Sequence, residues 1–171
     1  AKSSSSHMRM VYHALEQLLD ASNTKRNATA AVESLHQIAE ACPRRSLVVV
    51  FSDLLDRGGD VDAMMAALQH LRHNKHEVVI FHILDGQTEI DFDFPDRPTV
   101  FKDLETGDEV RLHPSEVRDV YRERMGALRK DLEVRCAQYR IDWVDVDIAK
   151  GLYPVLSAYL AKRAKMRSSR F

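Results

Sequence analysis

The stretch that decides the fold is Ser46-Leu-Val-Val-Val-Phe-Ser52, and Asp53 follows it directly. The stretch is short, rich in β-branched residues and apolar on both faces. Such a run is typical of a strand in a parallel sheet that helices cover on both sides. The sequence therefore predicts a fully buried, central parallel strand at 46–52, with a polar loop after it.

Two similar apolar runs follow at 77–84 and 141–146. Around the three runs, apolar residues recur at the spacing of an amphipathic helix. This spacing predicts helices over about 8–20, 28–41, 60–73, 115–139 and 149–165. Strands that alternate with helices build a parallel sheet with right-handed crossovers. The predicted fold is α/β, a partial doubly wound parallel sheet of three core strands flanked by helices.

Residues 85–113 break this alternation of strands and helices. Their aromatic and β-branched residues alternate with polar ones, and turn-forming pairs stand at Asp96-Arg97 and Gly107-Asp108. Alternation of this kind is typical of short, half-buried strands. We therefore expect a small β excursion over about 85–113.

The core of such a sheet can be predicted from the same pattern. Strands with helices on both faces leave no strand side chain in contact with water. The following six side chains should therefore be almost fully buried: Val48, Val50, Val78, Ile80, Phe81 and Val144.

Length and composition bound the class of protein. The 171 residues predict one domain over 1–171, of ordinary globular composition. Lys and Arg total 25 and Asp and Glu total 26, so charge gives no reason to expect a nucleic-acid partner. The longest purely apolar run, 47–51, is too short to span a membrane. Cys42 and Cys136 match no metal or redox spacing, which favours a reducing, cytoplasmic location.

Candidate functional residues follow the predicted strands. In open parallel sheets, ligands bind beyond the carboxyl ends of the strands. Asp53, Asp85, Asp145 and Asp147 stand at these ends, and carboxylates there can hold Mg²⁺ or move a proton. Each also has an ordinary structural interpretation: Asp53 as a cap, Asp85 as part of a turn, and Asp145 with Asp147 as a solvated strand end.

Histidines form a second group of candidates for metal binding. His70, His73 and His76 lie close together, but no carboxylate accompanies them in the sequence, which favours a solvated helix end. His36 lies within a predicted helix and His82 within a predicted strand. Both are expected to be packed and hydrogen-bonded rather than to bind metal.

Several segments resemble one known family. The segment Arg44-Arg-Ser-Leu-Val-Val-Val-Phe-Ser-Asp-Leu-Leu-Asp56 is similar to the central strand of the domain-of-unknown-function family 58, which is von Willebrand factor A-like. Other segments that fit the family are 35–40, 75–85, 101–107, Tyr121 and 159–163. The resemblance implies a doubly wound sheet with a metal-ion-dependent adhesion-type site at its carboxyl end.

The resemblance also implies which residues form that site. Thr29 matches the site's second loop and Asp53 its third loop, whereas the first loop, Asp-x-Ser-x-Ser on an earlier strand, is missing. The start of the chain is similar to the family's segment between its early strands and the first predicted helix. We therefore expect a C-terminal portion of the domain, with Mg²⁺ or Mn²⁺ bound only in the intact protein.

Three functions remain open at this point. The resemblance implies a non-enzymatic protein-interaction module, acting with a MoxR-type AAA+ ATPase. A phosphohydrolase-like enzyme is the alternative, with Asp53 as nucleophile and Asp56 as helper. The third is a structural scaffold. Loss of the early strands would also expose the edge of the 46–52 strand, which predicts self-association.

Overall fold

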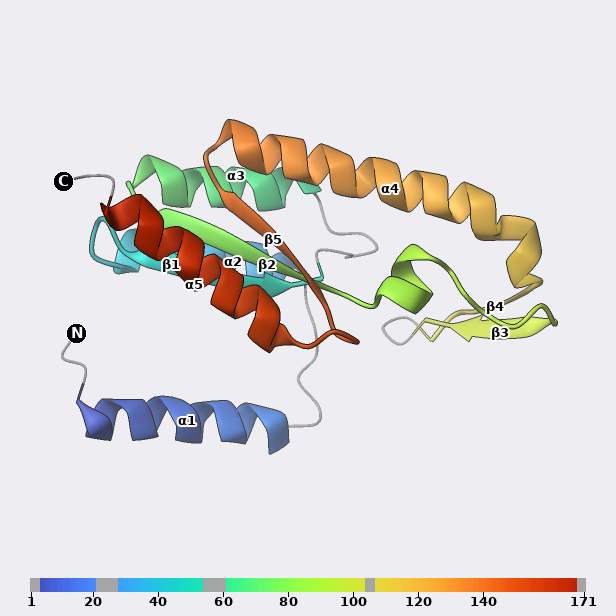
Figure 1. Ribbon diagram of the computed structural model, residues 1–171, viewed down its shortest axis with the longest axis horizontal. Coiled ribbons are helices and arrows are strands. Elements are labelled where there is room, and N and C mark those ends of the chain that lie inside the picture. The colour runs from blue at the N-terminus through green and yellow to red at the C-terminus, as the bar shows by residue number, and fades with distance from the viewer. Residues whose placement is uncertain (1–3, 21–27, 54–60, 104–106, 169–171) are drawn as a thin grey trace.

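The computed structural model describes residues 4–20, 28–53, 61–103 and 107–168, without the side chains at 18–20, 28–30 and 166–168 (Figure 1). The helices are α1 (Ser5–Asp20), α2 (Ala28–Ala41), α3 (Val61–His73), α4 (Pro114–Gln138) and α5 (Leu152–Ser168), and η1 (Gly86–Ile90) is a π-helical turn. The strands are β1 (Leu47–Ser52), β2 (Glu77–Leu84), β3 (Thr99–Lys102), β4 (Glu109–Leu112) and β5 (Asp142–Asp147). The structure thus confirms the predicted α/β class.

The main sheet has three parallel strands in the order β1-β2-β5. The strand β2 is therefore central, and it is the strand that is buried over nearly its whole length. The prediction that 46–52 is the central strand is wrong, because among the described strands β1 pairs only with β2 and so lies at an edge of this sheet. An apolar pattern on both faces does not determine where a strand stands in the order.

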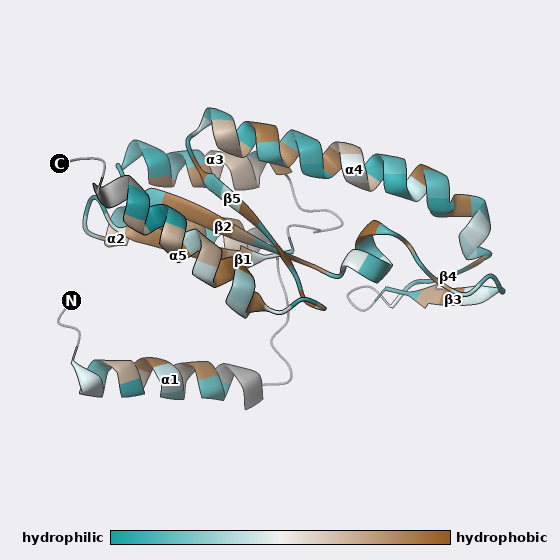
Figure 2. Cartoon of the chain, viewed as in Figure 1, coloured by the Kyte–Doolittle hydropathy of each residue, from teal (hydrophilic) through white to brown (hydrophobic). Residues whose placement is uncertain are grey.

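One face of the sheet carries the larger core. The helices α2, α3 and α4 pack on this face. In Figure 2, the residues of β2 are mostly hydrophobic, whereas hydrophobic and hydrophilic residues alternate along α4. The fully buried side chains of this core come from α3, β2 and α4 above all: Ala67, Leu68, Leu71, Val78, Ile80 and Cys136. Their burial is what fixes the three helices on the strands.

Among the described helices, α5 is the one that covers the other face. There Phe81 of β2 is 1% exposed, packed with Val79 and Val146 of the strands and Tyr159 of α5. Leu47, Val49 and Phe51 of β1 point to the same side and are exposed. Val50 and Val144, expected to be fully buried, are only half-buried, because β1 and β5 are both edge strands.

The predicted β excursion is confirmed as the turn η1 and the antiparallel pair β3–β4. A small aromatic cluster anchors it to α4, with Phe92 packed against Phe94, Phe101 and Tyr121. The guanidinium of Arg118 on α4 also donates to the carbonyls of Phe92 and Phe94, at 3.1 and 2.9 Å. The excursion is thereby held beside the N-terminal half of α4.

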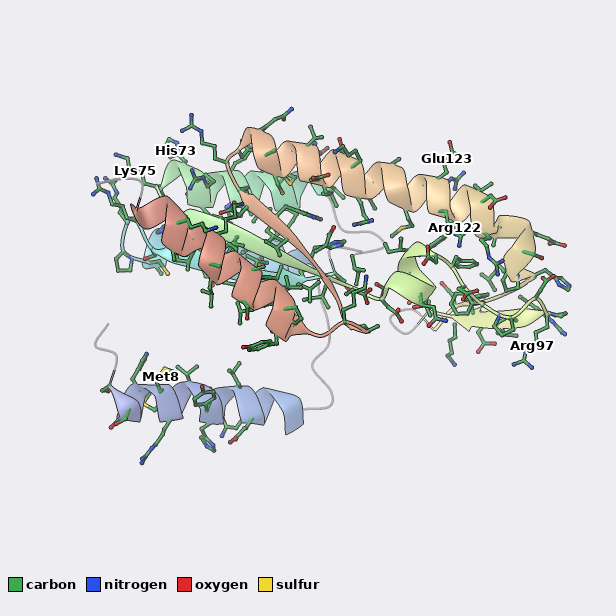
Figure 3. All side chains as sticks on the ribbon, in the orientation of Figure 1. Met8, His73, Lys75, Arg97, Arg122 and Glu123 are labelled. Carbon is green, nitrogen blue, oxygen red and sulfur yellow. The ribbon has the colours of Figure 1, made fainter. Side chains whose placement is uncertain are left out.

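The helix α1 lies apart from the sheet (Figures 1 and 3). Its described side chains are all exposed, among them Met8, Val11, Tyr12 and Leu15. The sequence predicted this helix from its apolar stripe, and the stripe has no described core to pack against. Both α1 and the β1 face therefore present apolar surface to solvent.

We predict that the chain self-associates through β1. An edge strand offers unpaired backbone groups, and exposed Leu47, Val49 and Phe51 add apolar surface to that edge. Light scattering on the eluting protein should show a dimer, and Val49→Lys should shift it toward monomer, because a charge on an edge strand opposes pairing. The matched control is Val100→Lys on the exposed face of β3. A wild-type monomer at high concentration would contradict the prediction.

Candidate functional site

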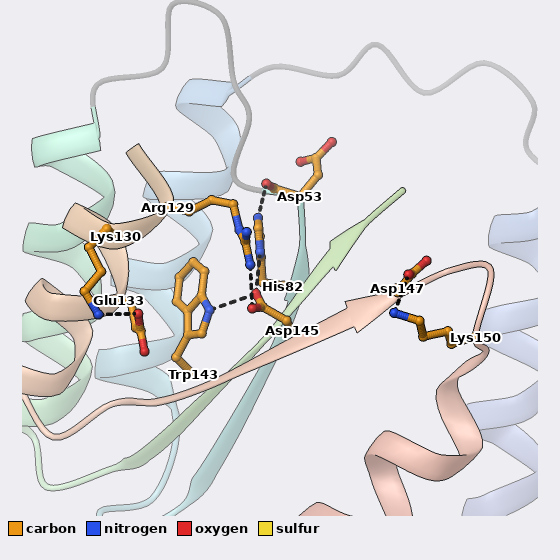
Figure 4. Close-up of polar contacts among 9 residues, drawn as sticks. All are labelled: Asp53, His82, Arg129, Lys130, Glu133, Trp143, Asp145, Asp147 and Lys150. Carbon is orange, nitrogen blue, oxygen red and sulfur yellow. Dashed lines mark hydrogen bonds and ion pairs between the residues drawn. The ribbon is translucent and has the colours of Figure 1, made fainter. Parts of the chain in front are cut away.

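Asp53 stands where the sequence placed it, directly after β1 at the carboxyl end of the sheet. It is exposed, and its carboxylate makes no hydrogen bond or ion pair with the residues that the structure describes. Figure 4 shows this carboxylate pointing away from the neighbouring polar side chains. The group is thus available to an ion or a partner.

The backbone of Asp53 is held by a histidine on the next strand. His82 of β2 has a side chain that is only 2% exposed. Its Nε2 lies 3.0 Å from the carbonyl oxygen of Asp53, and its Nδ1 lies 2.9 Å from Oδ1 of Asp145 on β5 (Figure 4). One imidazole ring therefore links the ends of all three strands, as expected for a packed, hydrogen-bonded histidine.

The carboxylate of Asp145 accepts hydrogen bonds from three side chains. Besides His82, it accepts from Nη2 of Arg129 on α4 at 2.7 Å and from the indole Nε1 of Trp143 at 3.0 Å. The hydrogen bond from His82 is the main cause that holds the pKa of Asp145 below its ordinary value, and Trp143 and Arg129 act in the same direction. Asp145 is therefore ionised at neutral pH.

The His82 ring is held from several sides. Its two polar partners are a carbonyl and a carboxylate, one at each ring nitrogen. The Trp143 ring packs beside it, with the two ring centroids 4.7 Å apart. His82 and Trp143 thus join the Asp145–Arg129 ion pair in one charged cluster at the carboxyl end of the sheet.

The other two strand-end carboxylates have structural roles. Asp85 caps η1, accepting from the hydroxyl of Thr88 at 2.8 Å and from the backbone N–H of Gln87 at 3.0 Å, and these bonds lower its pKa. Asp147 accepts from the backbone N–H of Ala149 and from Lys150, which lower its pKa too. The turn at Asp85 matches its ordinary interpretation. Asp147 does not match the solvated strand end that was expected, because its side chain is only 18% exposed and accepts from the turn that follows β5.

Gly86 leaves room for the Asp147 carboxylate. A Cβ atom at this position would lie 2.9 Å from Oδ2 of Asp147, which is closer than real Cβ contacts. A side chain at residue 86 would therefore displace this carboxylate from its place against η1.

Thr29 is the second predicted ligand, and it is the second residue of α2. Its side chain lies outside the described residues, as does all of Asp56. The helix α2 and β1 are joined by a short turn and each extends about 20 Å, so the start of α2 lies at the same end of the sheet as Asp53. That the two side chains are neighbours stays a prediction.

Sequence reasoning missed Arg129 and Trp143 in this cluster. Arg129 lies on a long helix that carries many other charged residues, and nothing local distinguishes it. Trp143 is two residues before Asp145 and so on the same face of β5, a signal that was available in the sequence. Within the described residues, no group of three His, Cys, Asp or Glu side chains is arranged to hold a metal ion.

Among the helices that the structure describes, none is long and apolar enough to cross a membrane. No curated protein and no solved structure shows a significant match to the chain. The model of the family described as "Protein of unknown function DUF58" matches residues 1–131, which end within α4 and leave β5 outside the match. The match spans most of the chain and includes Asp53 and His82, so the chain belongs to the DUF58 family.

Proposed function

We propose that this chain is a von Willebrand A-like protein-interaction module of the cytoplasm, not an enzyme, that acts with a MoxR-type AAA+ ATPase. The observation that carries the proposal is the placement of Asp53. Its carboxylate projects from the carboxyl end of the sheet, whereas its backbone is tied to the buried His82. A fixed backbone with an outward carboxylate suits a group that meets a cation and a partner.

The surrounding groups support binding over chemistry. His82 and Arg129 both donate to Asp145, and Asp85 and Asp147 cap turns. The hydrogen bonds described for these side chains are thus made to other residues of the chain. In the intact protein, Asp53 and Thr29 would be two of the residues that hold Mg²⁺ or Mn²⁺, and one position on the ion would stay open for an acidic side chain of the partner.

The proposal is tested by capture of the ATPase. The complete gene product that contains this chain is immobilised and offered the MoxR-type ATPase of the same organism, with Mg²⁺ or with EDTA. We expect capture that EDTA and Asp53→Ala both abolish. The matched control is Asp119→Ala, which removes an exposed carboxylate from α4. Capture that is absent, or that survives both EDTA and Asp53→Ala, would contradict the proposal.

A separate prediction concerns the 171-residue chain by itself. Asp53 and Thr29 supply one carboxylate and one hydroxyl, and a strongly hydrated ion is not held by so few ligands. Isothermal titration with Mg²⁺ and Mn²⁺ should therefore show no micromolar binding at Asp53. Micromolar binding that Asp53→Ala removes would show that other residues complete the site.

The enzymatic alternative has its own assay. If Asp53 were a nucleophile, the chain with Mg²⁺ would release phosphate from an aryl phosphate, and Asp53→Asn would stop that release. We expect no phosphate release above that of buffer. Turnover that depends on Asp53 would overturn the assignment as an interaction module.

A further inference from the structure

A pair of histidines joins α2 and α3 on the larger core face, far along both helices from Asp53. His36 of α2 and His70 of α3 face each other through their Nδ1 atoms, which lie 3.0 Å apart. The two rings are 5.2 Å apart between centroids and tilted by 44°. His70 has a side chain that is 29% exposed, so an ion in solution can reach the pair.

The carboxylate of Glu40 contacts one histidine of this pair. Oε1 of Glu40 lies 2.7 Å from Nε2 of His70, on the opposite side of the ring from His36. A carboxylate at Nε2 keeps the proton on that nitrogen and leaves Nδ1 with a lone pair. A carboxylate on the far nitrogen is the usual support of a metal-bound histidine. Sequence reasoning missed it, because Glu40 lies 30 residues before His70.

We propose that His36 and His70 form a binding site for a divalent transition-metal ion of the Zn²⁺, Ni²⁺ and Cu²⁺ class. At metal–nitrogen distances of about 2.0–2.1 Å, nitrogens 3.0 Å apart subtend roughly 95° at the ion. That angle fits two adjacent ligands of a tetragonal site and is a small distortion of a tetrahedral one. Imidazole is a preferred ligand of these metals, and Mg²⁺ is not expected to bind here.

The ion would replace the hydrogen that the two Nδ1 atoms share. His70 already presents a lone pair at Nδ1, and His36 supplies the second lone pair when its proton moves to Nε2. Water or a partner group fills the remaining positions, because the described residues offer no third His, Cys, Asp or Glu ligand at this point. The bound ion would connect α2 to α3.

The helices are already fixed relative to each other near this pair. The side chain of Asn74 donates to the carbonyl of Ala39 at 2.8 Å, one residue from Glu40. The ring of buried His76 lies 3.4 Å from the same carbonyl. Two contacts at the end of α2 thus hold the histidine pair in register without an ion, which lowers the entropic cost of binding.

The proposal is tested by isothermal titration calorimetry, which measures the binding of Zn²⁺ to the whole chain. We expect one ion per chain, with binding weakened at least tenfold in His36→Gln and in His70→Gln and about tenfold in Glu40→Gln. The matched control is His73→Gln, one turn further along α3 and exposed (Figure 3). Asp53→Ala should also leave Zn²⁺ binding unchanged, which separates this site from the proposed Mg²⁺ site.

A second readout identifies the ligands directly. With Cu²⁺ in place of Zn²⁺, electron paramagnetic resonance should show coupling to two nitrogen atoms, and His36→Gln should reduce it to one. Thermal unfolding checks that each variant folds. The proposal is overturned if wild type binds no Zn²⁺ at submillimolar concentration, if His36→Gln and His70→Gln bind as wild type does, or if His73→Gln loses binding equally.

Discussion

Phe81→Ala should destabilise the protein by about 3–5 kcal/mol, the usual cost of removing a large side chain from a core. Phe81 is 1% exposed on the central strand β2. Its ring stacks on Phe51 of β1 at 5.1 Å and meets Tyr159 of α5 edge-on at 5.4 Å. The substitution would leave a cavity between two strands and α5, the helix described on this face.

The measurement is urea unfolding followed by circular dichroism. The control is Tyr153→Ala on α5, which also removes an aromatic ring but from a side chain that is 83% exposed. We expect its free energy of unfolding to lie within about 0.5 kcal/mol of wild type. A loss below about 1 kcal/mol in Phe81→Ala would show that α5 does not pack on β2 as described.

Local pattern was sufficient for most elements of the fold. The predicted helix over 28–41 coincides with α2, and the predicted strand at 77–84 coincides with β2. Pro114 opens α4, as expected for a proline in a first helical turn. In these segments the apolar periodicity and the flanking residues act within a few positions, so the sequence contains the whole signal.

The order of the strands could not be predicted from local pattern. A run that is apolar on both faces, such as 46–52, can form a central strand. The same run can also form an edge strand that leaves one apolar face exposed to solvent. Leu47 and Phe51 are exposed because no described element covers them, a fact about the rest of the chain rather than about β1. The same pattern underlies the expected self-association.

The candidate site was predicted in position but not in its contacts. Asp53 follows β1 as the sequence indicated, but its support comes from His82, 29 residues later, and from Asp145, 63 residues after that. Contacts over such separations depend on strand register, which pairs His82 with Asp145 across β2 and β5. Register was not available from the sequence, so the charged cluster was not predicted.

Asp145→Asn tests that cluster. The substitution keeps the shape of the side chain but leaves Arg129 without its anion and removes the carboxylate that accepts from His82 and Trp143. Hydrogen bonds to charged groups contribute about 1.5–3 kcal/mol each, and the 43% exposure of Asp145 places the expected loss in the lower part of that range. The free energy of unfolding should therefore fall by about 1.5–2 kcal/mol at pH 7.

The pH dependence of that loss distinguishes charge from shape. The pKa of Asp145 is lower in the folded protein, chiefly through His82, so its stabilisation is complete above the ordinary carboxyl pKa of about 3.9. As the pH falls through the lowered folded value, this stabilisation is lost. The difference in urea midpoint between wild type and Asp145→Asn should thus be constant from pH 7 to 5 and shrink below pH 4. Asp119→Asn, an exposed carboxylate on α4, is the control and should show little difference at any pH.

The same variant connects the cluster to the candidate site. Without the Asp145 carboxylate, the His82 ring loses the contact that orients it at Nδ1, and its Nε2 need not stay beside the carbonyl of Asp53. The residue that follows β1 would then lose its hydrogen-bond contact with the His82 side chain. Amide hydrogen exchange at 51–53 should become faster in Asp145→Asn than in Asp119→Asn. Unchanged exchange would mean that backbone pairing alone positions Asp53, and that the charged cluster stabilises the sheet without shaping the site.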